Sequence, residues 1–159
     1  MQIGTKEIKG LSGHAVGRQL LAEMYLAHTG RPMPQILISP MGKPYFPDSS
    51  LHFSISHTKR RVFCVLSTKP VGIDAEEMDR RIDLRLAEKI LSESEKAHYE
   101  AARDKRLTLL RFWVLKEAAA KCTGEGLRGY PNQTDFSPYD PRIQVRNNCL
   151  VAVIEEEDH

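Results

Sequence analysis

The stretch Val71-Gly72-Ile73-Asp74-Ala75-Glu76 lies near the middle of the 159-residue chain and predicts a β-strand with two unlike faces. Successive side chains of a strand point to opposite sides, so Ile73 and Ala75 share one face and Asp74 and Glu76 share the other. We expect the apolar pair to point into the core. The two carboxylates then lie side by side on the opposite face.

Two neighbouring carboxylates repel each other unless a cation lies between them. Mg²⁺ favours hard oxygen ligands and binds one or two protein carboxylates together with water and substrate phosphates, so Asp74 and Glu76 are candidate metal ligands. The alternative is a solvated acidic strand end, because Glu77 and Asp79 follow directly. The spacing of two acids does not by itself decide between them.

A second candidate segment precedes this strand, at Phe53-Ser54-Ile55-Ser56-His57-Thr58. The alternation predicts a strand with Phe53 and Ile55 inward and the two serine hydroxyls on the other face. Hydroxyl and imidazole groups at a strand end are suited to phosphate oxygens. A polar strand end in solvent is the alternative. The GxSxG pattern of the hydrolase nucleophile is absent from the sequence.

The third candidate segment, Trp113-Val114-Leu115-Lys116-Glu117-Ala118-Ala119-Ala120-Lys121, belongs to a predicted helix over residues 104–122. Glu117 and Lys121 are four residues apart, which is typical of an ordinary surface ion pair. Trp113 has the same spacing from Glu117, and a tryptophan more often packs in a core than stacks on a ligand.

Outside these segments, hydrophobic periodicity and turn residues predict the remaining elements. The expected helices cover residues 12–28, 83–91 and 94–102, with Ser12 as the first N-cap and Ser92 or Ser94 as the last. The expected strands cover residues 36–39, 51–56, 62–67 and 71–76, and a hairpin joins 143–146 to 149–154 across Asn147-Asn148. Residues 127–141 are expected to form a loop.

The net charge of +2 conceals an uneven distribution along the chain. Residues 1–72 contain nine Lys/Arg and three Asp/Glu, residues 73–154 contain fourteen of each, and residues 155–158 are all acidic. The first part is therefore expected to attract an anion. The small overall excess and the lack of a nucleic-acid motif argue against a nucleic-acid partner. No apolar run is long enough for a membrane span or a signal peptide.

Taken in order, these segments resemble the Sfp-type 4′-phosphopantetheinyl transferases, within the holo-acyl-carrier-protein synthase superfamily. The family pattern runs from a GKP turn through (F/W)NxSHS, (V/I)G(I/V)DxE and Wx₂KEAxxK to GxGL. Two positions depart from it, since Ser54 replaces the usual Asn and Thr58 the usual Ser. The matching stretches are Gly42-Lys43-Pro44, Phe53–Thr58, Val71–Glu76, Trp113–Lys121 and Gly124-Glu125-Gly126-Leu127.

The resemblance implies an enzyme that transfers 4′-phosphopantetheine from coenzyme A to a serine of an acyl or peptidyl carrier protein, releasing 3′,5′-ADP. It implies Mg²⁺, or Mn²⁺, on Asp74, Glu76 and Glu117. Glu117 would act as the base, and Lys121 would offset the charge on the leaving group. Lys43, Ser56, His57 and Lys121 would bind the coenzyme. Arg18 and Arg31 are candidates for its 3′-phosphate.

The resemblance also implies an α+β fold of two similar halves, residues 1–72 and 73–159, within one domain. Each half would pack a helix on a small antiparallel sheet, with a pseudo-twofold relation between them. Because both halves lie in one chain, we expect a monomer. The three scattered cysteines, with no CxxC motif, favour a reducing cytoplasm.

Two other hypotheses belong to different classes. One is a catalytically degenerate module that binds coenzyme A without transfer. The other is an electropositive protein-interaction domain with no small-molecule site.

Overall fold

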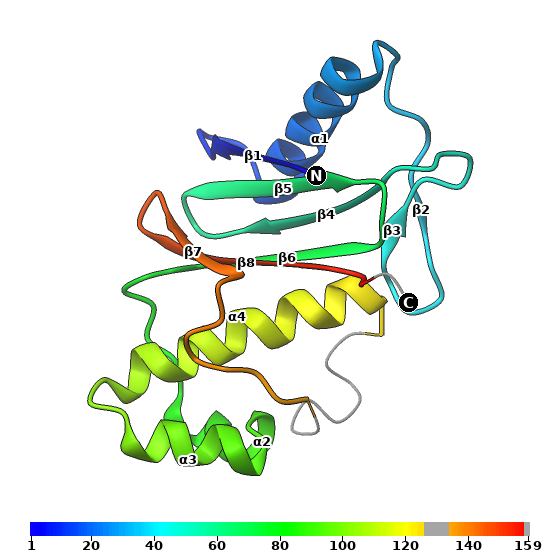
Figure 1. Ribbon diagram of the computed structural model, residues 1–159. Helices are drawn as coiled ribbons and strands as arrows, with labels where there is room; N and C mark the ends of the chain where they lie inside the picture. Colours follow the sequence, from blue (N-terminus) through cyan, green and yellow to red (C-terminus); the bar gives the residue numbers. More distant parts are fainter. Residues whose placement is uncertain (126–133, 158–159) are drawn as a thin grey trace.

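The computed structural model describes residues 1–125 and 134–157, which form four stacked layers (Figure 1). Helix α1 covers a first sheet, a second sheet lies beneath it, and α4 covers the far face of the second sheet. The first sheet contains β1 (Gln2–Glu7), β4 (His52–His57) and β5 (Arg61–Ser67). The second contains β6 (Val71–Glu77), β7 (Ile143–Arg146) and β8 (Cys149–Glu155).

The helices and the remaining short strands lie around these two sheets. The two covering helices are α1 (Gly13–Thr29) and α4 (Lys105–Thr123). A short hairpin of β2 (Leu37–Ile38) and β3 (Pro44–Tyr45) follows α1. Between β6 and α4 come the 3₁₀ turn η1 (Leu84–Leu86), α2 (Ala87–Ile90) and α3 (Glu93–Ala101). None of the helices within the described ranges combines the length and apolarity that a bilayer crossing requires.

The two sheets repeat one connectivity. Their strand orders are β1-β5-β4 and β6-β8-β7, all antiparallel, so each half runs strand, helix, hairpin, with the last strand in the middle. The predicted combination of helices with small antiparallel sheets is confirmed. The pseudo-twofold relation between the halves stays a prediction. β6 begins at Val71, so the predicted division after residue 72 falls inside this strand.

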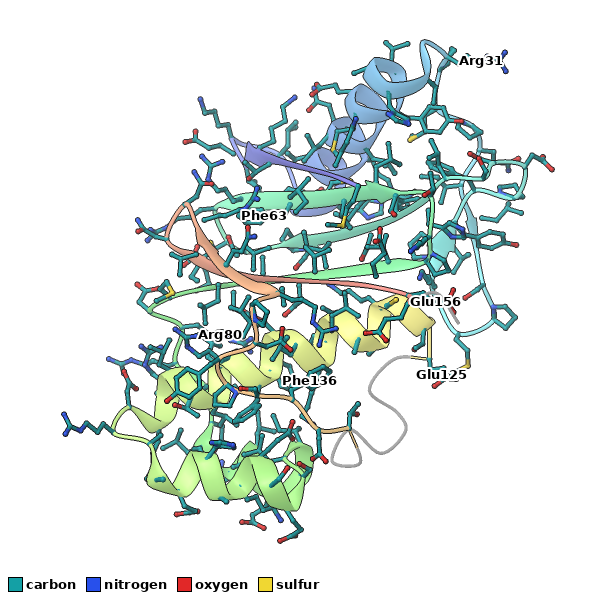
Figure 2. The ribbon with its side chains drawn as sticks, viewed as in Figure 1. Arg31, Phe63, Arg80, Glu125, Phe136 and Glu156 are labelled. Atoms are coloured by element: carbon teal, nitrogen blue, oxygen red, sulfur yellow. The ribbon has the colours of Figure 1, made fainter. Side chains whose placement is uncertain are left out.

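The alternation of apolar side chains explains why two sheets stack. On β5, Val62 and Cys64 belong to the core beneath α1, whereas Phe63 lies in the layer between the sheets (Figure 2). Ile73 and Ala75 of β6 lie in the same middle layer, as the sequence predicted. Both sheets are therefore covered on both faces. The opposite face of β6 is turned toward α4.

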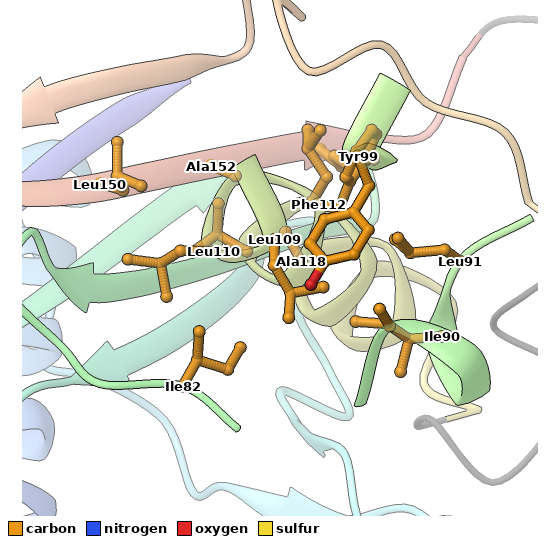
Figure 3. Close-up of a cluster of buried hydrophobic side chains, with 14 of the residues drawn as sticks. Ile82, Ile90, Leu91, Tyr99, Leu109, Leu110, Phe112, Ala118, Leu150 and Ala152 are labelled. Carbon is orange, nitrogen blue, oxygen red and sulfur yellow. The ribbon is translucent and has the colours of Figure 1, made fainter. Parts of the chain in front are cut away.

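The core of the second half forms between α4, β8 and the segment from Ile82 to Tyr99 (Figure 3). Leu109, Leu110 and Phe112 of α4 are fully buried there. Gly72 lets α4 come close to β6, because a Cβ at this position would lie 2.0 Å from the Ala118 carbonyl oxygen. This close approach brings α4 directly over the acidic face of β6.

Most predicted boundaries agree with the structure to within one or two residues. The first helix begins after Ser12, whose hydroxyl accepts a hydrogen bond from Ala15 N–H, and ends at Gly30 in the left-handed region. The Asn147-Asn148 turn has positive φ at both residues, as a tight hairpin requires.

Four elements differ from prediction. The helix expected over 83–91 is reduced to η1 and the single turn α2, because Leu91 turns to an extended backbone. The strand expected over 36–39 has only two residues. The sequence predicted neither the two-residue β3 nor β1, which is mostly polar and lies at the edge of the first sheet. The loop expected over 127–141 lies partly outside the described residues, and 134–142 contain no helix or strand.

Candidate functional site

A pocket of about 200 Å³ lies where the two halves meet, and four of the five sequence motifs contribute to its wall. The β2–β3 hairpin and β4 supply one side, and the last turns of α4 supply the other. The lining residues are Met41, Gly42, Lys43, Pro44, Phe53, Ser54, Ile55, Glu117, Ala120, Lys121 and Gly124. Segments far apart in the sequence therefore converge here. Gly126 and Leu127, which complete the fifth motif, lie outside the described residues.

Asp74 lies on the face of β6 that α4 covers, and its side chain is buried, with 6% of the residue exposed. Its Oδ1 accepts hydrogen bonds from Ser56 Oγ at 3.2 Å and from Lys121 Nζ at 3.3 Å. Its Oδ2 is buried without a hydrogen-bond partner among the described residues. Burial raises the pKa of Asp74 to about 7, against the attraction of Lys121. A buried oxygen with no donor is the feature that a missing cation would satisfy.

The two serines of β4 hold the free edge of β6. Ser54 Oγ accepts a hydrogen bond from Ile73 N–H, and Ser56 Oγ accepts one from Ala75 N–H, both at 3.1 Å. The buried Ser56 hydroxyl lies between the Ala75 amide and Asp74, so it orients the carboxylate. Its predicted role as a coenzyme contact stays a prediction.

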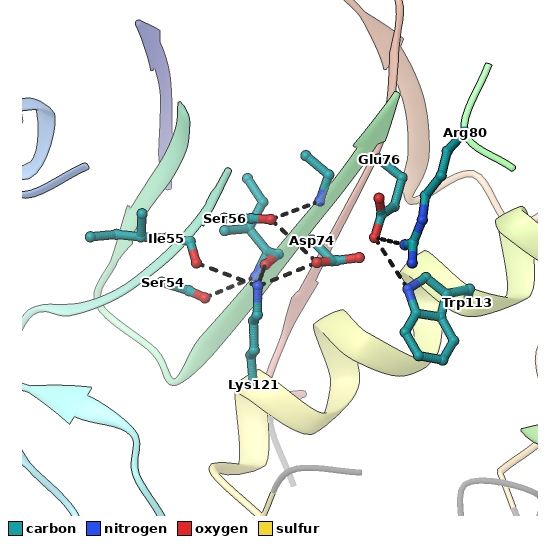
Figure 4. Close-up of polar contacts among 10 residues, drawn as sticks. Ser54, Ile55, Ser56, Asp74, Glu76, Arg80, Trp113 and Lys121 are labelled. Atoms are coloured by element: carbon teal, nitrogen blue, oxygen red, sulfur yellow. Dashed lines mark hydrogen bonds and ion pairs between the residues drawn. The ribbon is translucent and has the colours of Figure 1, made fainter. Parts of the chain in front are cut away.

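Lys121 extends from α4 toward β6 (Figure 4). Its Nζ donates to Ile73 O at 3.0 Å and Ile55 O at 3.4 Å as well as to Asp74. The surface pair with Glu117 that helical spacing suggested is therefore not formed, and Lys121 pairs across the junction with Asp74. Glu117, one turn earlier, is half-buried, and desolvation raises the pKa of its carboxyl group.

The Glu76 carboxylate lies between Asp74 and the pair formed by Arg80 and Trp113 in the view of Figure 4. Its Oε1 accepts a hydrogen bond from Trp113 Nε1 at 3.2 Å and forms an ion pair with Arg80. The Arg80 guanidinium also lies over the Trp113 ring, 5.8 Å from its centroid. Trp113 is thus a site residue, which its position in the sequence alone did not establish.

The three predicted metal ligands fit a hard cation in chemistry. Asp74, Glu76 and Glu117 are all carboxylates, and the negative charges of the latter two raise the pKa of Asp74, so the three groups interact. Asp74 also presents the orphaned Oδ2. As the side chains stand, no three Asp, Glu, His or Cys residues in the described ranges are gathered closely enough to bind one ion. Glu76 is paired with Arg80 in this arrangement.

The two other predicted coenzyme contacts lie on either side of this centre. Lys43 Nζ donates to the Cys122 carbonyl at 2.7 Å, which ties the hairpin to the end of α4, and burial lowers its pKa. His57 is exposed at the end of β4. It lines a groove of about 760 Å³ that also contains Lys59, Arg60, Arg80 and Arg81. The same groove is lined by Glu76, Glu77 and Asp79, so its charge is mixed.

The two arginines considered for the 3′-phosphate come from α1 and the segment after it. Arg31 lies beyond the end of this helix and projects away from the molecule (Figure 2). This position does not favour a role at the pocket. Arg18 is partly buried on α1, and nothing in the structure links it to the pocket.

A buried ion pair beside the site was missed from sequence. Lys116 Nζ lies 2.8 Å from Glu95 Oε1, and both side chains are almost fully buried. Glu95 also closes a capping box with Ser92, and its second oxygen accepts a hydrogen bond from Phe136 N–H. The Ser-x-x-Glu spacing of a capping box was the available signal. Lys116 belongs to the same motif as Glu117, but its role is to join α3 to α4.

Comparisons with known proteins agree with this geometry. Residues 70–155 match the family model described as the 4′-phosphopantetheinyl transferase superfamily. The chain is 36% identical over 88 residues to the 4′-phosphopantetheinyl transferase gsp of Aneurinibacillus migulanus, covering 54% of this chain and 36% of the relative. Identity to psf-1 of Bacillus pumilus is 34% over 122 residues, covering 74% and 50%. Identity to AcpT of Escherichia coli K12 is 36% over 112 residues, covering 67% and 57%. The matched region spans about half or less of each relative's length in most cases.

Proposed function

Because the chain belongs to the 4′-phosphopantetheinyl transferase superfamily, we propose that it transfers 4′-phosphopantetheine from coenzyme A to a serine of an acyl or peptidyl carrier protein. The observation that carries the proposal is the single pocket lined by four motifs from both halves. Its wall contains the cations of Lys43 and Lys121, which suit phosphates, and the carboxylate of Glu117, and Lys121 pairs with the buried Asp74. We further propose that the protein acts as a monomer in the cytoplasm.

In the proposed reaction the serine oxygen of the carrier attacks the β-phosphorus of coenzyme A. A new P–O bond forms there, and the P–O bond to the departing 3′,5′-ADP breaks. Glu117 accepts the serine proton, and its raised pKa makes it a stronger base than an exposed glutamate. Lys121 holds Asp74 in place and adds positive charge beside the developing negative charge.

Asp74, Glu76 and Glu117 would hold Mg²⁺, with Mn²⁺ as the alternative ion. A bound divalent cation supplies charge neutralisation at the pyrophosphate. Asp74 is the principal ligand in this proposal, because its Oδ2 is buried and has no donor among the described residues. Lys43 and His57 would contact the phosphates of the coenzyme from the two sides of the centre.

The test is a transfer assay with purified chain, coenzyme A, Mg²⁺ and several apo carrier proteins, read by the intact mass of each carrier. We expect at least one carrier to gain one phosphopantetheine group, and the Asp74→Asn variant to lose this activity. Absence of modification on every carrier, with a chain shown to be folded, contradicts the proposal.

The second candidate is a coenzyme A-binding module without transfer. It is kept because the alignments cover only 36–57% of the relatives cited above. Calorimetry separates the two functions, since binding of coenzyme A without turnover supports the module. If Asp74→Ala leaves the affinities for coenzyme A and Mg²⁺ unchanged, neither function holds and a protein-interaction domain is favoured.

A further inference from the structure

Glu76, Arg80 and Trp113 form a compact cluster at one end of the carboxylate centre (Figure 4). The carboxylate of Glu76 receives both the guanidinium of Arg80 and the indole N–H of Trp113 on the same oxygen, Oε1. Arg80 is held in addition by the face of the Trp113 ring. These three interactions therefore hold Glu76, Arg80 and Trp113 together.

The charges at the centre are already balanced in part by these internal cations. Lys121 pairs with Asp74 and Arg80 pairs with Glu76, so of the three carboxylates only Glu117 has no ion-pair partner of its own among the described residues. A divalent cation and a guanidinium repel each other and compete for the same carboxylate oxygen. Arg80 occupies Oε1 of Glu76, so a metal that binds through this oxygen displaces the Arg80 pair.

The surroundings of Arg80 allow this movement. Its side chain is 39% exposed and lines the groove of about 760 Å³ beside Lys59 and Arg81. A released guanidinium can thus enter solvent without leaving a buried charge. Lys121 is held more firmly than Arg80, since its Nζ donates to three oxygens at the junction, those of Ile55, Ile73 and Asp74.

We propose, on the basis of the metal site in the proposed function, that Arg80 is the counter-ion of Glu76 in the metal-free protein and that a divalent cation displaces it. Arg80 is then a positioning residue that sets metal affinity, because each binding event must break its pair with Glu76. The displacement also removes the guanidinium from the face of the Trp113 ring, so the indole environment changes when the metal binds.

The experiment measures metal binding by the full chain without coenzyme A or carrier. Mn²⁺ affinity is followed by electron paramagnetic resonance, and Mg²⁺ is followed by tryptophan emission, because Trp113 is the single tryptophan of the chain. Arg80→Gln is compared with Arg81→Gln, which removes the same charge from the neighbouring residue of the same groove. Arg80→Lys keeps the charge at Arg80, and circular dichroism checks the fold of each variant.

We expect Arg80→Gln to bind Mn²⁺ about tenfold more tightly than the natural chain, and Arg81→Gln to differ by less than about twofold. Arg80→Lys is expected to fall between them. Mg²⁺ should shift the tryptophan emission of the natural chain and shift it much less in Arg80→Gln. Equal or weaker Mn²⁺ binding by Arg80→Gln, or emission that saturating Mg²⁺ leaves unchanged, overturns the proposal.

The outcome also separates this inference from the proposed function. If metal affinity follows Arg80 as expected while no carrier is modified, the displacement stands and the transferase proposal fails. If transfer occurs and all variants bind metal equally, the displacement fails and the transferase proposal stands. A chain that binds neither Mn²⁺ nor Mg²⁺ overturns the displacement and the metal assignment together.

Discussion

Helices α1 and α4 each cover one sheet of the same strand order, yet they bury different kinds of side chain. The buried residues of α1 are Val16, Gly17, Leu20, Leu21 and Tyr25, which are apolar except for the tyrosine hydroxyl. Helix α4 buries a similar apolar face but includes Lys116 and lies over Asp74. Among the described residues, the buried charged side chains all belong to the second half, and they are Asp74, Glu95 and Lys116.

This difference indicates a division of labour between two copies of one connectivity. Buried charges contribute little to stability compared with apolar packing, so a fold retains them for another reason. The first half supplies an apolar platform and, at the junction, the Ser54 and Ser56 hydroxyls that hold β6. The second half supplies the carboxylates of the proposed site and a buried pair that joins α3 to α4.

The strongest test of this division compares Glu117→Gln in the second half with Lys43→Gln in the first. Loss of the proposed general base should lower kcat about 10²- to 10⁴-fold with little change in KM. Loss of the Lys43 cation should instead raise KM for coenzyme A about tenfold or more, because a charge-assisted phosphate contact is lost. Steady-state kinetics, with the apo form of a carrier that the chain modifies, measures kcat and KM for both variants. If Lys43→Gln reduces kcat as strongly as Glu117→Gln, the two halves do not divide in this way.

The next largest effect is expected on stability. Lys116→Met leaves Glu95 buried without its cation, and breaking a buried pair in this way costs about 3–5 kcal/mol of unfolding free energy. The matched change in the first half is Lys6→Met, which removes an ion pair with Glu23. The Lys6 side chain is 34% exposed and the Glu23 side chain 54%. It should cost less than about 1 kcal/mol. Urea unfolding gives both values, and similar losses in the two variants contradict the comparison.

A pH effect should follow from Asp74 in the metal-free chain. Its pKa rises from 3.8 to about 7 on folding, so the unfolded chain loses this proton first as the pH increases. The stabilisation that this pKa shift provides is fully present below about pH 4 and is lost as the pH rises through about 7, a change of about 4 kcal/mol.

Unfolding free energies in EDTA between pH 5 and pH 8 measure this effect against Asp74→Asn, which should lack the decline. Glu23→Gln is the control from the first half, because its carboxylate is half exposed. Its pH profile should run parallel to that of the natural chain. If the pH profile of Asp74→Asn also runs parallel to that of the natural chain, Asp74 does not titrate as described.

Local patterns predicted the elements that depend on their own residues. The helix cap at Ser12, the Asn147-Asn148 turn and the two faces of β6 follow from side-chain periodicity and backbone preference, and the structure confirms them. The first strand was missed because it lies at a sheet edge and none of its residues is buried, so its sequence shows little apolar periodicity.

Features that depend on contacts between distant residues were beyond such patterns. The spacing of Glu117 and Lys121 suggested a pair on one helix, but Lys121 pairs with Asp74, which lies 47 positions away in sequence. The bond from Ser56 to Asp74 likewise depends on β4 lying beside β6, and the contact of Arg80 with Trp113 depends on α4 lying over β6. Motif order predicted candidate residues, and the packing of α4 and β4 against β6 gave their contacts.

The smallest expected effect compares two glycines on the first strand of each sheet. A Cβ at Gly72 would lie 2.0 Å from the Ala118 carbonyl oxygen and 2.5 Å from the Cys122 amide nitrogen, so Gly72→Ala must push α4 away from β6. A Cβ at Gly4 would lie 2.7 Å from Met24 Sδ, the end of a flexible side chain that can turn aside.

We expect Gly72→Ala to cost about 1–3 kcal/mol of unfolding free energy and Gly4→Ala well under 1 kcal/mol. Gly72→Ala should also weaken Mn²⁺ binding, because a displaced α4 moves Glu117 and Lys121 relative to Asp74, whereas Gly4→Ala should leave it unchanged. Urea unfolding and Mn²⁺ titration measure the two quantities. If both variants lose equal stability with unchanged metal binding, close contact between α4 and β6 is not what positions the site, and the contrast between the halves lies in their charged residues alone.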